Sequence, residues 1–294
     1  MSVFTGAGVA IITPMKANGE VNYDKLGEFL DYQINNSTDA IIICGTTGEA
    51  STLTHEEHVE TIRFAADYVK KRVPVIAGTG SNSTACAIEI SQEACKNGAD
   101  ALLLVTPYYN KTSQRGLIAH YTAIHDATNL PIILYNVPSR TGVNIKPETA
   151  AELAKLPRVN GIKEASGDLD QVAKIHELCG DELNIWSGND DQIFDILERG
   201  GKGVISVLSN IAPKETHEIV ASYLNGDKKT SKELMDKYVK LAKAMFVDVN
   251  PIPVKEAVSL IGFNAGPLRL PLIEMDESNK KYVKETMEEY GLVK

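Results

Sequence analysis

One lysine stands inside an apolar segment of this chain, where a charged side chain is costly to bury. Lys163 lies within residues 159–165, Val-Asn-Gly-Ile-Lys-Glu-Ala, which otherwise has the composition of a buried strand. Burial disfavours the charged form of an amine and frees its lone pair, which carbonyl attack and imine formation require. Taken alone, a lysine whose stem packs while its ammonium reaches water is the commoner case. The other polar segments of the chain favour chemistry.

Hydroxyl-bearing and basic residues follow several other apolar runs. Individually, such residues are more often helix caps, rim packing or solvated loop residues than parts of a site. Placed together at the carboxyl ends of neighbouring strands, around a strand lysine, they favour an active site. These candidates are Thr46, Thr47, Tyr108, Tyr109, Tyr135, Ser139, Arg140 and Ser206.

Eight short apolar runs, rich in Val, Ile and Leu, recur along the chain with amphipathic segments between them. They do not alternate with polar residues, as expected for parallel strands that are covered on both faces. The runs are Gly8–Thr13, Ala40–Cys44, Val73–Gly78, Ala101–Thr106, Ile132–Asn136, Val159–Ala165, Leu183–Ser187 and Gly203–Leu208. The pattern predicts an α/β fold, a (β/α)₈ TIM barrel with a C-terminal helical extension. A doubly wound open sheet is the alternative, but no Gly-x-Gly-x-x-Gly fingerprint follows the first run.

The chain is expected to divide into a barrel and an extension. Residues 1–211 are assigned to the (β/α)₈ catalytic barrel, because the eight runs all fall there. Residues 212–294 show only helical patterning and are assigned to the final barrel helix and the C-terminal extension. Helices are predicted over Lys232–Phe246, Pro253–Ile261 and Asn279–Tyr290.

The composition of the chain limits the kinds of partner and the compartment that we expect. The net charge is −9 and no basic run occurs, so nucleic acid and anionic membranes are poor partners. No apolar run is long enough for a membrane span, and no basic segment introduces a signal sequence. The four cysteines form no Cys-x-x-Cys pair, which fits a reducing cytoplasm. No histidine ends an apolar run and no carboxylates cluster, so we expect neither a metal nor a cofactor, and carbonyl activation through an imine instead.

Six segments, in order along nearly the whole chain, resemble the dihydrodipicolinate synthase family of pyruvate-dependent class I aldolases, a superfamily that includes N-acetylneuraminate lyase. Each segment is moderately specific, and six at consistent spacing are strongly so. They are Gly45–Glu49, Pro107–Asn110, Tyr135–Gly142, Gly161–Ala165, Gly203–Val207 and Asn250–Lys255.

The resemblance implies a role for each reactive side chain. Lys163 would form the Schiff base with pyruvate, and Tyr135 would donate and accept protons. Thr46 and Tyr109 would complete a hydroxyl relay from Tyr135 to bulk water. A relay of this kind fits the chemistry, because a tyrosine hydroxyl can move protons repeatedly only if they are replenished.

The resemblance also implies the substrates. Thr47 and Ile205 would contact pyruvate, and Arg140 would receive the carboxylate of the second substrate, L-aspartate 4-semialdehyde. The expected product is 4-hydroxy-tetrahydrodipicolinate, in diaminopimelate and lysine biosynthesis. A sugar-acid lyase of the same superfamily is the main alternative, which Arg140 disfavours because a planar guanidinium suits a small carboxylate better than a polyol. A non-catalytic metabolite-binding barrel is a further one, although binding alone needs no proton relay.

Assembly and regulation follow from the same resemblance. Tyr109 would reach into the site of a neighbouring subunit, so we expect a homo-oligomer, either a dimer or a dimer of dimers. Lysine-inhibited relatives carry a glutamate where this chain has Cys86, and that carboxylate pairs with the ammonium of the inhibitor. We therefore expect weak or absent inhibition by L-lysine, unless Glu49 or Glu89 supplies the missing charge.

Overall fold

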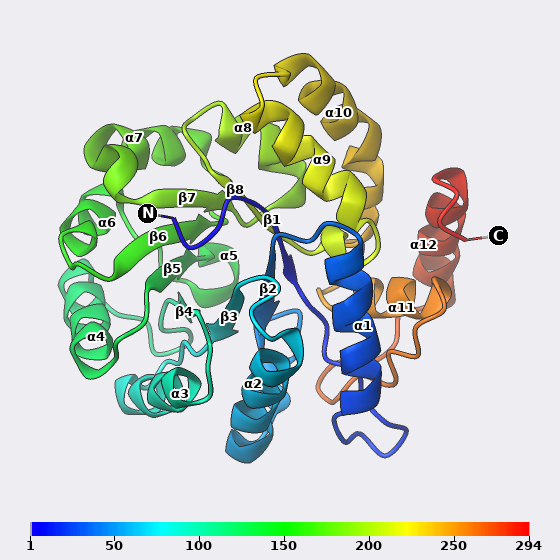
Figure 1. Ribbon diagram of the computed structural model, residues 1–294, viewed down its shortest axis with the longest axis horizontal. Helices are drawn as coiled ribbons and strands as arrows, with labels where there is room; N and C mark the ends of the chain where they lie inside the picture. Colours follow the sequence, from blue (N-terminus) through cyan, green and yellow to red (C-terminus); the bar gives the residue numbers. More distant parts are fainter. Residues whose placement is uncertain (1, 294) are drawn as a thin grey trace.

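The computed structural model describes residues 2–293, whose strands close into a parallel barrel with helices around the outside (Figure 1). Each strand pairs with its sequence neighbours, and β8 closes the ring on β1. The strands are β1 (Gly6–Ala10), β2 (Ala40–Ile43), β3 (Val75–Gly78), β4 (Ala101–Val105), β5 (Ile132–Asn136), β6 (Val159–Glu164), β7 (Asn184–Ser187) and β8 (Gly203–Ser206). The predicted (β/α)₈ barrel is confirmed.

Helices follow each strand, and three further helices complete the chain. The helices of the barrel are α1 (Tyr23–Asn35), α2 (His55–Val69), α3 (Thr84–Lys96), α4 (Gln114–Ala127), α5 (Pro138–Thr141), α6 (Pro147–Ala154), α7 (Leu169–Cys179), α8 (Ile193–Leu197) and α9 (Pro213–Leu224). Those beyond it are α10 (Lys228–Ala244), α11 (Ile252–Leu260) and α12 (Glu277–Glu289). The three C-terminal helices predicted from the sequence are thus present, each beginning one to four residues earlier than expected.

The first strand lies nearer the N-terminus than its apolar run suggested. It was predicted over 8–13, whereas β1 spans Gly6–Ala10 and pairs with β8 from Gly6 onward. Beyond Ala10 the chain leaves this ladder, and the Ile12 N–H donates to Asn210 Oδ1 at 3.1 Å. Ile11 and Ile12 remain fully buried outside the strand. Their burial therefore explains their apolar character.

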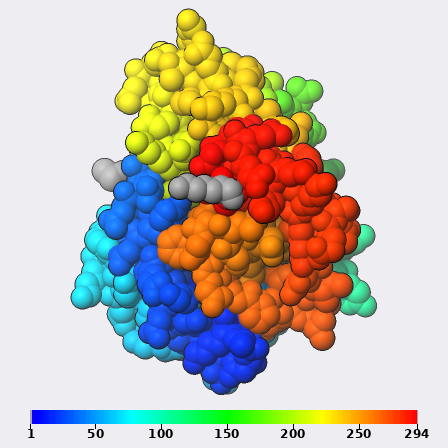
Figure 2. Space-filling view, turned by 90° about the vertical axis from the view of Figure 1, so that its right-hand side faces the viewer, coloured from blue at the N-terminus to red at the C-terminus, as the bar shows by residue number. Residues whose placement is uncertain are grey.

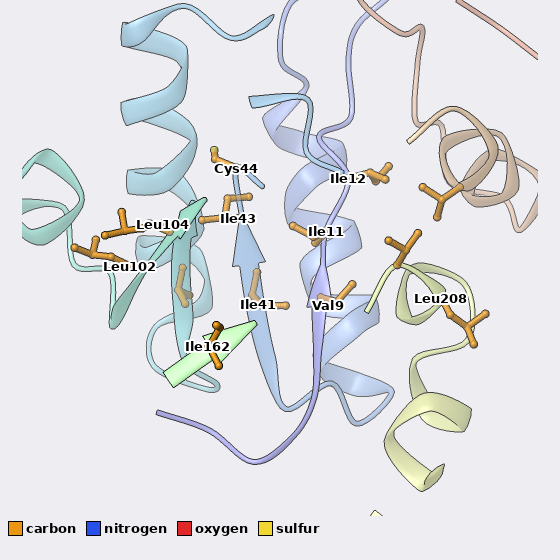
Figure 3. Packing of buried hydrophobic residues seen from close by; sticks show 14 of the residues in the cluster. Val9, Ile11, Ile12, Ile41, Ile43, Cys44, Leu102, Leu104, Ile162 and Leu208 are labelled. Atoms are coloured by element: carbon orange, nitrogen blue, oxygen red, sulfur yellow. The ribbon is translucent and has the colours of Figure 1, made fainter. Parts of the chain in front are cut away.

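Alternation along the strands separates two apolar regions. One set of side chains fills the barrel interior and includes Ala10, Ile42, Leu103, Ile133, Tyr135, Trp186 and Ile205. The intervening residues point outward and pack under the helices, as Figure 3 shows for Val9, Ile41, Ile43, Leu102, Leu104 and Ile162. Because both faces of each strand are covered, the strands read as continuous apolar runs.

The C-terminal region shares the core of the barrel. The helix α9 packs against β1 and β8, and α10 packs on α9. Residues from α10, α11 and α12 belong to the same apolar cluster as the outward side chains of the barrel. Figure 2 shows this region covering one side of the molecule beside α1. The division at residues 211 and 212 stays a prediction about chain organisation.

The expectation of purely helical structure after residue 211 is wrong for residues 262–276, which form neither helix nor strand. Gly266 has φ +70°, and a Cβ there would lie 1.8 Å from the carbonyl oxygen of Met15. Arg269 anchors the segment by donating to the carbonyl oxygens of Gly19 and Thr52 and by pairing with Glu57. A positive-φ glycine and one partly buried, multiply bonded arginine thus replace helical hydrogen bonding.

No helix within residues 2–293 combines the length and the apolar character that a membrane span requires.

Candidate active site

Lys163 and Tyr135 face one another inside the barrel. They are register partners on β6 and β5, and both side chains point inward because their neighbours Ile162 and Leu134 point outward. The Lys163 Nζ lies 4.3 Å from the centroid of the Tyr135 ring. Lys163 is 5% exposed and Tyr135 7%. The strand lysine is therefore buried beside a phenol, as the sequence suggested.

These two residues line a cavity of about 210 Å³ at the carboxyl ends of the strands. Of the seven residues to which the resemblance assigns a role, the cavity brings five together: Thr46, Thr47, Tyr135, Arg140 and Lys163. It is bounded also by residues without an expected role, among them Gly188, Asn189, Val207, Phe246 and Asn250. Its size suits small metabolites, and its position matches the catalytic face of (β/α)₈ barrels.

Because Gly188 has no side chain, the aliphatic part of the Lys163 side chain can occupy the space beside it. A Cβ at this position would lie 3.1 Å from Lys163 Cε and 2.6 Å from Ala165 Cβ. Any larger residue would therefore crowd the amine-bearing side chain. Gly188 follows β7, whose carboxyl end the sequence analysis did not inspect. Applying the strand-end criterion to that strand would have found it.

Asn250 joins two of the candidate substrate-binding residues. Its Nδ2 donates to Thr47 Oγ1 at 3.1 Å, and its main-chain oxygen accepts from Arg140 Nη2 at 3.2 Å. Asn250 is 6% exposed, and its Oδ1 is buried without a hydrogen-bond partner among the described residues. The asparagine comes from the segment between α10 and α11, so the C-terminal extension completes the cavity. The sequence marked this segment as a motif but assigned it no role.

The candidates differ in exposure. Thr47 is 2% exposed, whereas Thr46 and Arg140 are exposed at the rim of the cavity. The Arg140 guanidinium is fixed at one end by Asn250 and is otherwise accessible to an anion. The cavity thus has a buried inner end and an exposed, basic outer end.

Two candidates do not line the cavity. Ile205 is fully buried within the barrel, in the same interior cluster as Tyr135. Tyr109 is 91% exposed and adopts a left-handed φ of 68°. Among residues 2–293, no hydrogen bond connects the hydroxyls of Tyr135, Thr46 and Tyr109, so a single chain does not assemble the relay. The roles expected for Ile205 and Tyr109 stay predictions.

A buried carboxyl lies on the other side of the lysine. Asp190, after β7, is 2% exposed and its Oδ2 accepts from the N–H groups of Val207 at 3.0 Å and Leu208 at 2.9 Å. Burial raises the pKa of the Asp190 carboxyl, and hydrogen bonds together with the nearby charge of Lys163 oppose that rise. Asp190 therefore holds the loop after β8, which bounds the cavity through Val207.

A buried ion pair fixes the loop that carries the two threonines. Lys255 Nζ on α11 lies 2.5 Å from Glu49 Oε1, and both side chains are at most 2% exposed. Lys255 also donates to the Pro267 carbonyl oxygen at 2.7 Å, and the Arg269 N–H donates to Glu49 Oε2 at 3.0 Å. Burial lowers the pKa of Lys255, which Glu49 opposes. Losing one partner would leave an uncompensated buried charge.

The comparisons with known proteins agree with this geometry. The model of the dihydrodipicolinate synthetase family matches residues 3–290. A 4-hydroxy-tetrahydrodipicolinate synthase from Lachnoclostridium phytofermentans is 59% identical over 294 residues, covering 100% of both chains. This chain belongs to the dihydrodipicolinate synthetase family. The resemblance drawn from the six motifs is thereby confirmed.

Solved structures of dihydrodipicolinate synthases share the fold of this family member. The enzyme from Cyanidioschyzon merolae with lysine bound has a TM-score of 0.97 at 38% identity, covering 100% of both chains. The chloride-inhibited enzyme from Acinetobacter baumannii complexed with pyruvate has a TM-score of 0.96 at 42% identity, covering 98% of this chain and 99% of that one.

In this member of the dihydrodipicolinate synthetase family, Cys86, the residue from which weak inhibition by L-lysine is expected, is exposed. Of the two residues that could supply the missing charge, Glu49 is occupied by Lys255. Glu89 is exposed and lies 3.9 Å from His55 Nε2. Weak inhibition by L-lysine stays a prediction. In the part of the chain that the structure describes, no group of three or more His, Cys, Asp or Glu side chains is arranged to hold a metal ion.

Proposed function

We propose that this protein condenses pyruvate with L-aspartate 4-semialdehyde to 4-hydroxy-tetrahydrodipicolinate, through a Schiff base on Lys163. The observation that carries the proposal is the Lys163 amine, buried in the cavity 4.3 Å from the Tyr135 ring centroid. Full-length relatives named 4-hydroxy-tetrahydrodipicolinate synthase, at 55–59% identity, support the same reaction. The protein is thus a lyase of the class I aldolase type.

The first half-reaction uses the inner end of the cavity. The amine of Lys163 adds to the C2 carbonyl of pyruvate, and loss of water gives an imine. The hydroxyl of Tyr135 serves as the proton donor and acceptor in these steps. The cationic imine acidifies the adjacent methyl group, which loses a proton to give an enamine. Thr47, buried at the inner end, contacts the pyruvate carboxylate.

The second half-reaction uses the rim. Arg140 binds the carboxylate of the semialdehyde, and the enamine carbon attacks the aldehyde carbon to form the new C–C bond. The amino group of the semialdehyde then adds to C2 and closes the ring, which displaces the Lys163 amine and regenerates the enzyme. In this scheme Thr46, with Tyr109 of a neighbouring subunit, returns protons from Tyr135 to water. The working form is therefore a homo-oligomer, placed in the reducing cytoplasm because its cysteines are free.

Trapping the imine tests the central step. Pyruvate with borohydride should leave one reduced adduct per chain, mapped by peptide mass spectrometry to Lys163. Lys163→Ala should abolish the adduct, and Lys174→Ala, which removes an exposed lysine on α7, should leave it unchanged. An undiminished adduct in Lys163→Ala would overturn the proposal.

Turnover with different acceptors separates the alternatives. Formation of product from aspartate semialdehyde supports the synthase. Cleavage of a sugar acid such as N-acetylneuraminate, with no activity on the semialdehyde, would favour the sugar-acid lyase. An imine-forming protein without turnover on either acceptor would favour a metabolite-binding barrel.

A further inference from the structure

The carboxyl ends of β5 and β6 carry two successive register pairs on opposite faces. Tyr135 pairs with Lys163 and points into the barrel, and Asn136 pairs with Glu164 and points outward. The outward pair lies directly behind the inward one, since successive side chains of a strand alternate between its faces. Any change in the outward contact therefore acts on the spacing of the same two strands that present the amine and the phenol.

Glu164 is a buried acceptor surrounded by donors. It is 1% exposed, and Asn136 Nδ2 donates to its two oxygens at 3.0 and 3.2 Å. Gln171 Nε2 on α7 donates to Oε2 at 3.1 Å, and the Ser166 N–H donates to Oε1 at 2.6 Å. No lysine, arginine or histidine within residues 2–293 forms an ion pair with it. Hydrogen bonds alone therefore satisfy this carboxylate. Burying a carboxylate is costly unless each of these hydrogen bonds is made.

Asn136 extends the contact to the loop that carries Arg140. Its Nδ2 also donates to Asn144 Oδ1 at 2.7 Å, and its Oδ1 accepts from the Ile145 N–H at 2.9 Å. Asn144 Nδ2 in turn donates to Gln171 Oε1 at 2.7 Å. The segment over 137–143, which contains α5 and Arg140, is thus joined at its far end to Asn136, the residue that precedes it.

We propose that the contact between Asn136 and Glu164 is a positioning device for the reaction, which sets the separation of Lys163 from Tyr135 and the placement of Arg140. The inference rests on the proposed function. Neither outward residue touches the cavity, so both act through their strand neighbours. Burial raises the pKa of Glu164, and the bonds from Ser166, Asn136 and Gln171 oppose that rise.

The decisive variant is Glu164→Gln, which keeps the size of the side chain and replaces one acceptor oxygen with a donor. That donor faces Asn136 Nδ2 or the Ser166 N–H, so two donors meet and the strands shift apart. A displacement of about 1 Å between reacting groups can cost on the order of 100-fold in rate. The rate of imine formation is measured at saturating pyruvate by quenching samples with borohydride at successive times. We therefore expect this rate to fall at least about tenfold in Glu164→Gln, whereas the pyruvate concentration needed for half-saturation should change less.

A double variant that exchanges the donor and the acceptor tests whether the reaction needs the contact itself or one particular residue. In Asn136→Asp with Glu164→Gln, the acceptor moves to β5 and the donor to β6, so the contact is restored with the same net charge. Asn144 and Gln171 carry both a donor and an acceptor and can rotate to match. The double variant should recover a large part of the lost rate.

Asn184→Ala is the matched control for stability. Asn184 on β7 is 8% exposed and donates to the Asn160 carbonyl oxygen at 2.7 Å, so its loss also breaks a partly buried hydrogen bond to β6. That bond lies at the opposite end of the strand from Lys163. The control should lower the melting temperature and leave the imine-forming rate within about twofold of the unchanged protein, as a distant structural substitution does.

The outcomes distinguish this inference from the function beneath it. If the protein without substitutions forms no pyruvate adduct, both the proposed function and the positioning role are overturned. An adduct that forms equally fast in Glu164→Gln overturns the positioning role alone, as does a slow Glu164→Gln with no recovery in the double variant. If Glu164→Gln does not fold, Gln171→Ala decides in its place, because it leaves Glu164 itself in place and removes one of the donors to it together with the contacts of Gln171 to Asn144. An unchanged rate there counts against the inference and a slowed rate supports it.

Discussion

At the scale of single residues, the site depends on one buried amine and on how differently its neighbours are exposed. Lys163 and Thr47 are enclosed, whereas Arg140 lies at the rim with one nitrogen bonded to the main chain of Asn250. A guanidinium held at one end keeps its other donors directed at the cavity. In the proposed reaction, the inner residues serve the first substrate and Arg140 serves the second.

Arg140→Ala should therefore damage the second half-reaction selectively. Loss of a charge-assisted hydrogen bond costs about 1.5–3 kcal/mol, so kcat/KM for aspartate semialdehyde should fall at least about tenfold. The rate of borohydride-trapped imine formation should stay within about twofold, because the first substrate does not need the rim. Arg140→Lys should recover only part of the loss, because an ammonium lacks the planar fork. Equal damage to both half-reactions would show that Arg140 is structural.

At the scale of elements, the segment over 262–276 holds the active-site loop after β2 in place. Arg269 donates its N–H to Glu49 and its side chain to Glu57 on α2. The Lys255 ammonium reaches the same Glu49 from α11. The loop after β2, which is rich in glycine and threonine, is thereby held in place by charged residues from the C-terminal region.

Because of the ion pair between Glu57 and Arg269, the free energy of unfolding should depend on pH in the acidic range. Arg269 holds the pKa of Glu57 below its usual value of 4.5. A lowered native pKa means that the unfolded chain binds the proton more readily, so this contribution is complete above pH 4.5 and is lost as pH falls through the native pKa. Glu57→Gln should lower the free energy of unfolding by about 1–2 kcal/mol at neutral pH.

Urea unfolding from neutral pH downward checks this prediction. The difference between Glu57→Gln and the unchanged protein should shrink toward the acidic end. Glu60→Gln is the control on the same helix, because the pair of Glu60 with Arg63 is exposed and exposed pairs contribute about 1 kcal/mol or less. A constant difference at every pH would contradict the assignment to Glu57.

At the scale of the whole molecule, one exposed aromatic residue lacks a role within its own chain. Tyr109 is 91% exposed beside Tyr108, which is 38% exposed, and aromatic side chains of this kind are enriched at protein interfaces. The cavity also has an exposed threonine, Thr46, at its rim. Both observations fit a site completed by a second copy of the chain.

Subunit mixing should reveal that shared site. Tyr109→Ala and Lys163→Ala should each reduce turnover strongly. Mixed after dissociation, they should recover about a quarter of full activity, because half of the dimers are hybrids and each hybrid holds one intact site. Sedimentation should show a dimer or tetramer for the unchanged protein. A fully active monomer, or no recovery on mixing, would refute the shared site.

Much of this protein was predictable from its sequence. The eight apolar runs indicated the barrel, because parallel strands covered on both faces must be apolar throughout. Lys163 stood out because a lysine within such a run is energetically anomalous, and the motifs identified the family. These signals are local: each depends on residue types within a few positions.

Other features depended on residues that only folding brings together. Asn250 reaches Thr47 across a separation of 203 residues, and Lys255 reaches Glu49 across 206. The contact of Asn136 with Glu164 depends on the register of two strands, which no single segment specifies. The irregular segment over 262–276 was predicted to be helical, whereas the long-range contacts of Arg269 with Gly19, Thr52 and Glu57 decide its path. The sequence determined which strands form and which amine is the candidate nucleophile, whereas the spacing of the candidate reacting groups arises from long-range packing and register.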